Sequence, residues 1–381
     1  MKKYLIIPFL LFFTCGGSQD SVDEVEPSSN NIDTTTAVQD TTTSTTTIVD
    51  DSTTTTVQDT TTTTIIKNKC DDCDYISIGE LNENIISVPQ FAWNDYQRIY
   101  LENMKFENET FEIILNIGPS TNLYFQDNEQ YIQKGISFWQ NFALPEKYYG
   151  FFYNYSDLDW AINELNSSGF EGDMARAPCR DGVCSGANSG IYQRPPHFGV
   201  GVFGINSADS VDAYRYGPLH IHEVTHSVVA AQWIGNARNP QQSANDASPC
   251  WLNEGIAHAA GLSLGVETYE EYLDIRSSQV TARHLQQTVS ASTILNYYNE
   301  SIPGICIRNP DYVLGYSIGY LTVEAMNAMA GADSAMHMYS VMASGKDFEE
   351  AFELTYEISW NNAKPIFAEY VSLVINNLFN S

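Results

Sequence analysis

Two histidines and two glutamates near the middle of the chain have the types and the spacing of a hydrolytic metal site. The segment HEVTH begins at His222 and ends at His226, so on an α-helix both imidazoles lie on one face and can bind one zinc ion. Glu223 then points at a water on that metal. A second acidic residue, Glu254, follows in the segment WLNEGIAHAAG. The pattern predicts His222, His226 and Glu254 as zinc ligands and Glu223 as the general base.

The elements around the motif must hold it away from water. Gly217 and Pro218 break the chain directly before the motif, and residues 219–231 are mostly apolar or small, which predicts a helix in which the charged residues of the motif are partly buried. A chance HExxH on a solvated surface helix is the alternative. It is disfavoured because charged residues within an apolar helix are costly unless they bind a metal.

HEVTH together with WLNEGIA resembles the gluzincin zinc metallopeptidases, in which two histidines come from one helix and a glutamate from the next. WLNEG is similar to the aminopeptidase-N-like branch, whereas the long gap between His226 and Glu254 is more like that of bacterial collagenases. The resemblance covers about residues 195–375 and is specific at the metal site. It implies an α+β fold of two lobes, in which a mixed-sheet lobe with the metal helix precedes a mainly helical lobe. It also implies one catalytic zinc ion in the cleft between the lobes, and hydrolysis of peptide bonds by a metal-activated water.

A tyrosine further along the chain is expected to stabilise the oxyanion of the reaction. In aminopeptidase-like enzymes this hydrogen bond comes from a Tyr that is followed three residues later by Gly. Tyr316, with Gly319 after it, fits this pattern best. Tyr312, with Gly315 after it, is nearly as good, and Tyr320 is a third candidate. The alternative is that all of them only pack within a helix, as many must in a chain with 23 tyrosines.

His258 stands four residues after Glu254 and therefore shares its helical face. In several gluzincins an acidic residue at that position orients a ligand histidine, so a histidine here departs from the family. We expect His258 to be a hydrogen-bonded neighbour of the metal ligands. His220, two residues before His222, should point away from the zinc and have a structural role.

The expected substrate is a peptide or protein bound along a strand. Residues 198–206 form an alternating run with glycines, which predicts a strand. In gluzincins the strand before the metal helix is the edge strand that pairs with extended substrate, and such pairing reads no particular side chain. The Gly-x-Met-Glu-Asn strand by which aminopeptidases bind a free amine does not precede the metal helix. An endopeptidase is therefore favoured over an aminopeptidase.

A catalytically inactive surface adhesin that keeps a peptidase fold is the alternative from another class of protein. The intact ligands and Glu223 oppose it, since an inactive copy could lose any of them. Coverage of the site by residues 236–249, between the two metal motifs, would favour the adhesin, whereas an open groove along 198–206 would favour long peptides. An enzyme that acts on a cell-wall peptide is a further alternative.

The amino-terminal residues predict an exported protein. Lys2 and Lys3 precede an apolar stretch that is too short to span a membrane, as in a signal peptide. Cys15 after it indicates a bacterial lipoprotein, tethered to a membrane through lipid on the thiol, and ordinary cleavage with release is the alternative. The predicted location is extracellular or on the cell surface.

Composition and periodicity divide the chain into four parts. Threonine dominates the region after the signal peptide, which should be a disordered linker because it lacks the large apolar residues of a core. The parts are a signal peptide at 1–15, the linker at 16–66, a small strand-rich region at 67–127 and the catalytic domain at 128–381. Within this domain a helix is predicted from Asn128, a strand at 148–153, a helix from Ser156, and an almost wholly helical chain from Cys250 onward.

Cysteine parity supports export and lipidation. The chain has seven cysteines, so a lipidated Cys15 leaves an even number for disulfides in an oxidising compartment. The predicted pairs are Cys70 with Cys73, Cys179 with Cys184, and Cys250 with Cys306. The last bridge would brace the helix of Glu254 against the segment before Tyr316.

The acidity of the chain limits its partners. The formal net charge is −29 at pH 7, and such a field repels nucleic acid. Contact with a membrane is expected only through a lipid on Cys15, and no oligomeric state is predicted. The charge suits solubility or the attraction of basic peptides.

Overall fold

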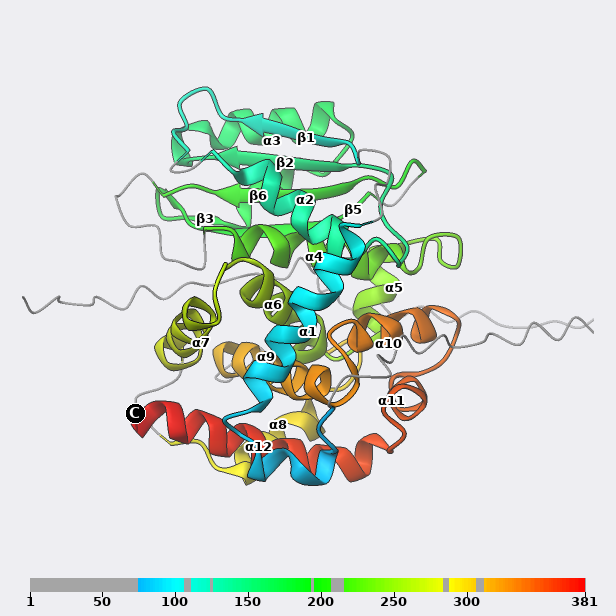
Figure 1. Cartoon of the computed structure of the whole chain (residues 1–381). Helices are drawn as coiled ribbons and strands as arrows, with labels where there is room; N and C mark the ends of the chain where they lie inside the picture. Colours follow the sequence, from blue (N-terminus) through cyan, green and yellow to red (C-terminus); the bar gives the residue numbers. More distant parts are fainter. Residues whose placement is uncertain are drawn as a thin grey trace, which may run out of the picture. The chain divides into compact units, whose positions relative to one another are not determined.

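Runs of aromatic and β-branched residues build the inner strands of a four-stranded sheet. The computed structural model describes residues 75–105, 111–123, 126–192, 195–206, 216–283, 288–305 and 312–380. Within them the strands lie in the order β1 (Ile113–Ile117), β2 (Tyr148–Tyr153), β6 (Gly199–Gly204) and β5 (Gly186–Ile191). β1, β2 and β6 run parallel, and β5 pairs antiparallel with β6 (Figure 1).

Helices cover both faces of this sheet, because successive strand side chains point to opposite faces. Phe152 belongs to the hydrophobic core that the sheet shares with two helices, whereas its neighbour Phe151 belongs to a second cluster on the other face. The two helices on the face of Phe152 are α2 (Asn128–Phe138) and α4 (Pro218–Ala231). The opposite face packs against α3 (Leu158–Ser167). The strand predicted at 148–153 and the helices predicted from Asn128 and Ser156 are confirmed, the last beginning as a short 3-10 turn.

β6 lies inside the sheet and not at its edge, so the edge position expected for residues 198–206 was wrong. Its glycines make room for neighbours on the α4 side, since a Cβ on Gly199 would lie 2.7 Å from the ring of Tyr148 and 3.3 Å from the Cβ of Ser227. The edge next to α4 is formed by β5, whose sequence GANSGI has Ile191 as its one β-branched residue. Strand propensity therefore marked the inner strand and not the edge strand.

The remaining helices form the second part of the fold. They are α1 (Val88–Asn103), α5 (Pro240–Ala247), α6 (Cys250–Leu264), α7 (Tyr269–Arg283), α8 (Ala291–Glu300), α9 (Tyr312–Ala330), α10 (Ser334–Ala343), α11 (Phe348–Tyr356) and α12 (Trp360–Asn380). α6 is packed between α4 and α9, and the other helices surround α6 and α9 below the sheet (Figure 1). The fold is thus a mixed α/β arrangement, in which a small mixed sheet is followed by a helical part, as predicted from Cys250 onward.

The region predicted at 67–127 to be strand-rich is mainly helical where the structure describes it. After the 3-10 helix η1 (Ile78–Glu83), α1 spans 16 residues, and β1 is the one strand in these described residues. Val88, Tyr96 and Ile99 are buried at helical spacing, so the period of the apolar residues is that of a helix. α1 packs against α9 and β1 joins the main sheet, so the described residues of this region form no separate sheet.

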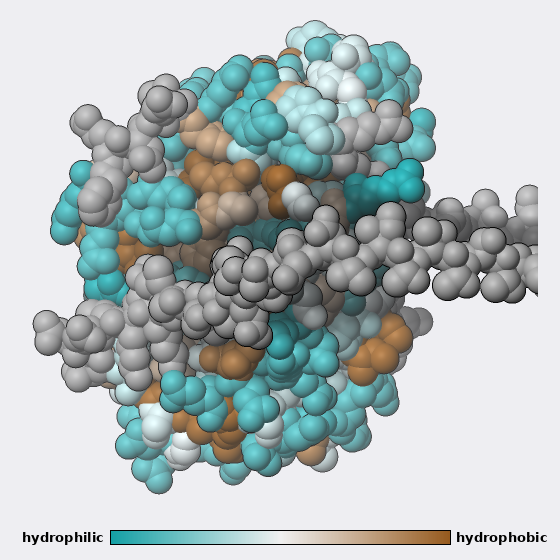
Figure 2. Space-filling view, turned by 90° about the vertical axis from the view of Figure 1, so that its right-hand side faces the viewer, coloured by the Kyte–Doolittle hydropathy of each residue, from teal (hydrophilic) through white to brown (hydrophobic). Residues whose placement is uncertain are grey.

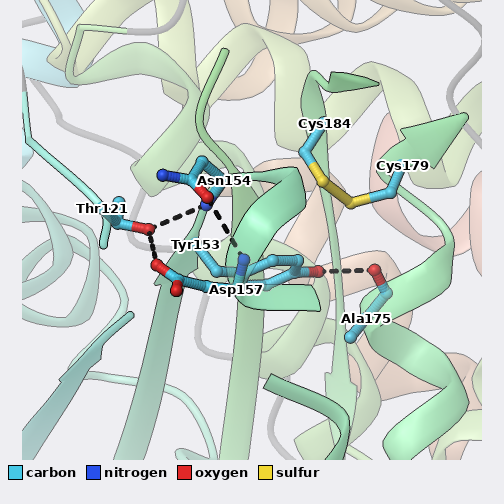
Figure 3. Close-up of a disulfide and its surroundings, with 7 residues drawn as sticks. All are labelled: Thr121, Tyr153, Asn154, Asp157, Ala175, Cys179 and Cys184. Carbon is cyan, nitrogen blue, oxygen red and sulfur yellow. Dashed lines mark hydrogen bonds between the residues drawn. A yellow bond between two sulfur atoms is a disulfide. The ribbon is translucent and has the colours of Figure 1, made fainter. Parts of the chain in front are cut away.

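A disulfide closes the short hairpin directly before β5. Strands β3 (Cys179–Arg180) and β4 (Val183–Cys184) pair antiparallel, and Cys179 is bonded to Cys184 as predicted (Figure 3). Beside it, the hydroxyl of Tyr153 donates to the backbone oxygen of Ala175 at 2.8 Å. Cys184 and Tyr153 share the second hydrophobic cluster, so the hairpin packs beside the end of β2.

Cys250, the first residue of α6, is also disulfide-bonded. Several predictions concern residues outside the described ranges: the signal peptide at 1–15 with Cys15, the linker at 16–66, the pair Cys70 with Cys73, and Cys306. The described residues belong to one compact unit that contains Lys69–Ser381. In them, helices of the length and apolarity needed to cross a membrane are not found.

The face of the protein in Figure 2 is mostly hydrophilic, with hydrophobic residues gathered in small groups. The same view shows the surface hollowed at mid-height, between the part that carries the sheet and the helical part below it. Large hydrophobic side chains that are exposed, such as Ile86 and Leu101, are spread over several elements. Such a surface agrees with a chain whose net charge of −29 favours solvation.

Candidate metal centre

α4 places the HEVTH segment in the interior of the protein. Gly217 has a positive φ of 95° and Pro218 is the first residue of the helix, so the chain turns sharply into α4. All residues of α4 are buried. The sheet covers one side of the helix and α6 covers the other. A helix whose residues are apolar or small on every side is expected in such a buried position. The helix predicted at 219–231 is confirmed, and its charged residues are buried more fully than expected.

His222, His226 and Glu254 come together as predicted. The Nε2 atoms of the two histidines are 3.0 Å apart, and Oε2 of Glu254 lies 3.4 Å from Nε2 of His222 and 3.5 Å from Nε2 of His226. Ligand atoms bound tetrahedrally to one zinc ion at about 2.0–2.1 Å are roughly 3.3 Å from one another. The three buried side chains therefore have the spacing to hold one metal ion.

Glycines bring α6 close to its neighbours and so set the position of Glu254. A Cβ on Gly255 would lie 2.5 Å from the backbone oxygen of Gly319 in α9, and a Cβ on Gly319 would collide with the backbone of α6. On the other side, a Cβ on Gly261 would lie 2.5 Å from the backbone oxygen of Pro218 in α4. Because α6 approaches both helices at backbone contact distance, the carboxylate of Glu254 reaches the histidines of α4.

The charges of these groups shift one another's pKa values. Burial alone would lower the pKa of His226, but the carboxylates of Glu254 and Glu223 and the side chain of Asn253 outweigh it and raise this pKa to about 9. Burial would raise the pKa of Glu254, but the two histidines hold it well below its usual range. Glu254 is therefore ionised, which is the state in which a carboxylate binds a metal.

Glu223, the expected general base, is held by a residue that sequence analysis missed. The hydroxyl of Ser189 in β5 donates a hydrogen bond to Oε2 of Glu223 at 2.6 Å. One turn further along α4, the hydroxyl of Ser227 donates to the backbone oxygen of Gly190 at 2.8 Å. The carboxylate thus lies against the edge strand and beside the metal ligands.

Two further residues of α6 lie beside the ligand histidines. Oδ1 of Asn253 is 3.2 Å from Nδ1 of His226, so the amide oxygen can accept from this nitrogen and turn Nε2 toward the metal position. The ring of His258 lies edge-on to that of His222, with centroids 5.7 Å apart. His258 thus lies beside a ligand histidine as expected, whereas its hydrogen bond to the metal ligands stays a prediction. Asn253 was missed, although it stands directly before Glu254.

Tyr316 and Tyr320 both approach this region from α9. Their ring centroids lie 6.4 Å and 5.4 Å from that of His258. The hydroxyl of Tyr320 donates to the carboxylate of Glu324 at 3.1 Å, so it is committed to another group. The side chain of Tyr312 lies outside the described residues. Among the tyrosines of α9 whose side chains are described, Tyr316 is therefore the remaining oxyanion candidate, and Gly319, three residues after it, also has a packing role.

A buried polar cluster anchors α9 beside the site. Glu324 accepts hydrogen bonds from Nε and Nη2 of Arg276 in α7, both at 2.7 Å, and from the hydroxyl of Tyr272 at 2.5 Å. The hydroxyl of Tyr370 in α12 lies 3.4 Å from the same carboxylate. The side chains of Arg276 and Glu324 are only 5% and 1% exposed, so each charge depends on the other for stabilisation.

His220 belongs to the core and not to the metal centre. Its Nε2 is 2.9 Å from Oδ1 of Asn128, and its ring stacks on those of Phe152 and Phe203. Burial lowers the pKa of His220 to about 3, so the imidazole is neutral around neutral pH. The structural role predicted for His220 is confirmed.

Comparison of the chain with family models, with curated proteins and with solved structures gave no match. The chemistry available at the centre is therefore inferred from its own residues. They supply converging metal ligands from two helices and, next to these, a carboxylate held by the edge strand. Such a set can activate a water molecule.

Proposed function

We propose that this protein is a zinc-dependent peptidase of the two-lobed gluzincin type, which hydrolyses peptide bonds with a metal-activated water. The observation that carries the proposal is the convergence of His222 and His226 with Glu254, beside the carboxylate of Glu223. Two imidazoles and one carboxylate form the ligand set of hydrolytic zinc sites that keep a fourth position for water. Imidazole nitrogens favour zinc over calcium or magnesium, which prefer oxygen ligands.

Each residue of the centre then has a separate role. A bound zinc ion would lower the pKa of its water and polarise the carbonyl of the substrate. Glu223, oriented by Ser189, takes the proton of the attacking water and passes it to the leaving amine. Asn253 holds the imidazole of His226, and the hydroxyl of Tyr316 donates a hydrogen bond to the oxyanion.

The proposed substrate is an extended peptide or protein segment bound along β5. This strand is the edge strand of the described sheet next to α4, and its Ser189 touches Glu223. A peptide paired with β5 would therefore pass the proposed general base. Backbone pairing reads no particular side chain, and a Gly-x-Met-Glu-Asn segment that would hold a free amine does not precede α4. We therefore keep an endopeptidase as the preferred activity and an aminopeptidase as the alternative.

A non-catalytic surface adhesin is the second candidate. The observation in its favour is that α5, within residues 236–249, packs against β5 and covers part of the strand edge. The observation against it is that Glu223 is kept and oriented beside the ligands. In both cases we propose an exported protein, either tethered to the cell surface through Cys15 or released.

The test is cleavage of a mixture of unfolded proteins by the zinc-loaded full chain, read by mass spectrometry. Glu223→Gln removes the proposed base but no ligand, so it should retain zinc and lose turnover by roughly 10²–10⁴-fold. Glu349→Gln changes an exposed glutamate of α11 in the same way and should cleave like the wild type. A chelator should stop cleavage, and added zinc should restore it.

Internal cuts that vanish in Glu223→Gln support an endopeptidase. Cuts confined to the first residue of each chain favour the aminopeptidase. Equal cleavage by Glu223→Gln and the wild type contradicts the assignment of the base, and a zinc-loaded wild type that cuts nothing supports the adhesin.

A further inference from the structure

The backbone of β5 has N–H and C=O groups on the side away from β6. In an antiparallel pair, residues whose backbone groups face the partner strand alternate with residues whose groups face away. The N–H of Tyr192 donates to the backbone oxygen of Phe198 at 2.7 Å. The backbone groups of Ile191, one residue earlier, therefore point away from β6. The same holds for Ser189, two residues before Ile191. These are the groups to which an extended peptide could add as a further strand.

Gln241 of α5 occupies one of these outward positions. Its Oε1 accepts a hydrogen bond from the backbone N–H of Ile191 at 3.2 Å. Nε2 of the same amide donates to Oδ1 of Asn245 at 3.3 Å, one helical turn further on, which keeps Oε1 turned to the strand. A Cβ on Gly190 would lie 3.2 Å from this Oε1, so the amide lies directly against β5. Strand addition therefore stops at Ile191.

The helix that carries Gln241 is firmly placed. The side chain of Asn239 caps its first turn by accepting from the backbone N–H of Gln242 at 3.1 Å. Pro240 begins the helix, and Pro240 and Ala244 are buried. Gln241 is thus presented to β5 by a capped and packed helix.

Ser189 marks where the bond to be cut would lie, because its hydroxyl binds the proposed base Glu223. A peptide residue next to that bond would face Ser189, and the residue two positions away would face Ile191. Antiparallel pairing is the more stable mode of strand addition and runs the peptide opposite to β5. The residue that faces Ile191 is then on the amino-terminal side of the bond to be cut.

We propose that Gln241 is a specificity-determining residue that ends substrate pairing on the amino-terminal side of the scissile bond. Residues more than about two positions upstream of that bond gain no backbone pairing with β5. Only a short segment of the peptide before the scissile bond thus pairs with β5. A longer amino-terminal portion does not strengthen binding. This inference rests on the proposed peptidase function.

The test uses the zinc-loaded full chain and synthetic peptides built around one bond that the protein cuts. The carboxyl side of each peptide is kept constant, and the amino side is lengthened from two residues to four and then six. In the wild type, kcat/KM should stay level over this series. In Gln241→Ala, which frees the N–H of Ile191 and the space beside Gly190, the longer peptides should gain roughly three- to tenfold, the effect of one added backbone hydrogen bond.

Two further variants separate the causes. Gln241→Leu keeps the bulk without the acceptor and should stay level like the wild type, because its side chain still covers the strand edge. Gln242→Ala is the matched control, because this exposed neighbour bonds Asp246 and not the strand, and it should also stay level. Zinc content equal to that of the wild type shows that each variant has kept its centre.

A wild type that gains from amino-side length as much as Gln241→Ala overturns the inference, and so does a Gln241→Ala variant whose kcat/KM stays level over the series. The proposed function survives both results, because cleavage still depends on Glu223. If no peptide is cut in a Glu223-dependent manner, the proposed function fails and this inference fails with it.

Discussion

The strand side and the helical side of the metal centre hold their residues by different means. On the strand side, hydroxyl groups tie α4 to β5, with Ser189 bound to Glu223 and Ser227 bound to the strand backbone. On the helical side, α6 meets α9 through glycines, and α9 is anchored in turn by the buried pair of Arg276 and Glu324. One side depends on single hydrogen bonds and the other on close packing and a buried charge pair.

The two sides also control different properties of the centre. The helical side sets where Glu254 lies, and it would therefore determine how firmly the proposed metal ion is held. The strand side sets the orientation of Glu223, and in the proposed reaction it would therefore determine how well a water is deprotonated. We expect substitutions on the helical side to change stability and metal binding first, and substitutions on the strand side to change turnover first.

The largest effect is expected at Arg276. Arg276→Met leaves Glu324 charged and unpaired in a region that excludes water, which typically costs about 3–5 kcal/mol of unfolding free energy. Urea unfolding measures this loss. The matched control is Arg176→Met, whose ion pair with Asp173 is highly exposed, at 60% and 89% for the two side chains, and which should cost less than about 1 kcal/mol. Equal losses in the two variants would show that the buried pair does not anchor the helical side.

A smaller effect is expected at the contact between α6 and α9. Gly319→Ala places a methyl group where the two backbones touch, so the helices must separate at a cost of about 1–3 kcal/mol. Because this movement displaces Glu254, zinc affinity measured by competition with a chelator should fall roughly tenfold or more. Gly79→Ala is the control, since a Cβ there would meet nothing within 4 Å. Unchanged zinc affinity in Gly319→Ala would mean that helix spacing does not position Glu254.

The residues on the two sides of the centre were not equally predictable from the sequence. HEVTH and its apolar surroundings could be recognised because the two histidines are neighbours on one helix, and WLNEG supplied the third ligand. The contact between Ser189 and Glu223 joins residues 34 positions apart through a strand whose composition does not indicate a strand. The edge position was therefore assigned to residues 198–206, whose strand propensity is stronger but which lie inside the sheet.

Gly319 shows a different limit of sequence analysis. Its place after Tyr316 matches an oxyanion pattern, yet a glycine at that position is also required by the contact of α9 with α6. Both explanations predict the same residue type, so the sequence alone cannot separate them. α1 illustrates the opposite case, because its buried residues do follow helical spacing, and the prediction of a strand-rich region was wrong although the correct period was present.

The smallest structural change tests the strand side. Ser189→Ala removes the hydroxyl that orients Glu223 but no metal ligand, so kcat should fall roughly tenfold. KM and zinc content should not change, and the unfolding free energy should change by no more than about 1 kcal/mol. Ser189→Thr keeps a hydroxyl and suits a strand, so it should restore most of the lost kcat. Steady-state kinetics on one peptide measures all of these effects.

Ser227→Ala is the matched control at the same junction of α4 and β5. It also removes one serine hydroxyl, but that hydroxyl binds the backbone of Gly190 and not the carboxylate of Glu223. This variant should lose about 1 kcal/mol of unfolding free energy and keep its kcat. A similar loss of kcat in both variants would mean that β5 only supports α4 as a whole. A loss confined to Ser189→Ala would tie turnover to the orientation of the base, because only in that variant can the carboxylate of Glu223 turn away from the metal position.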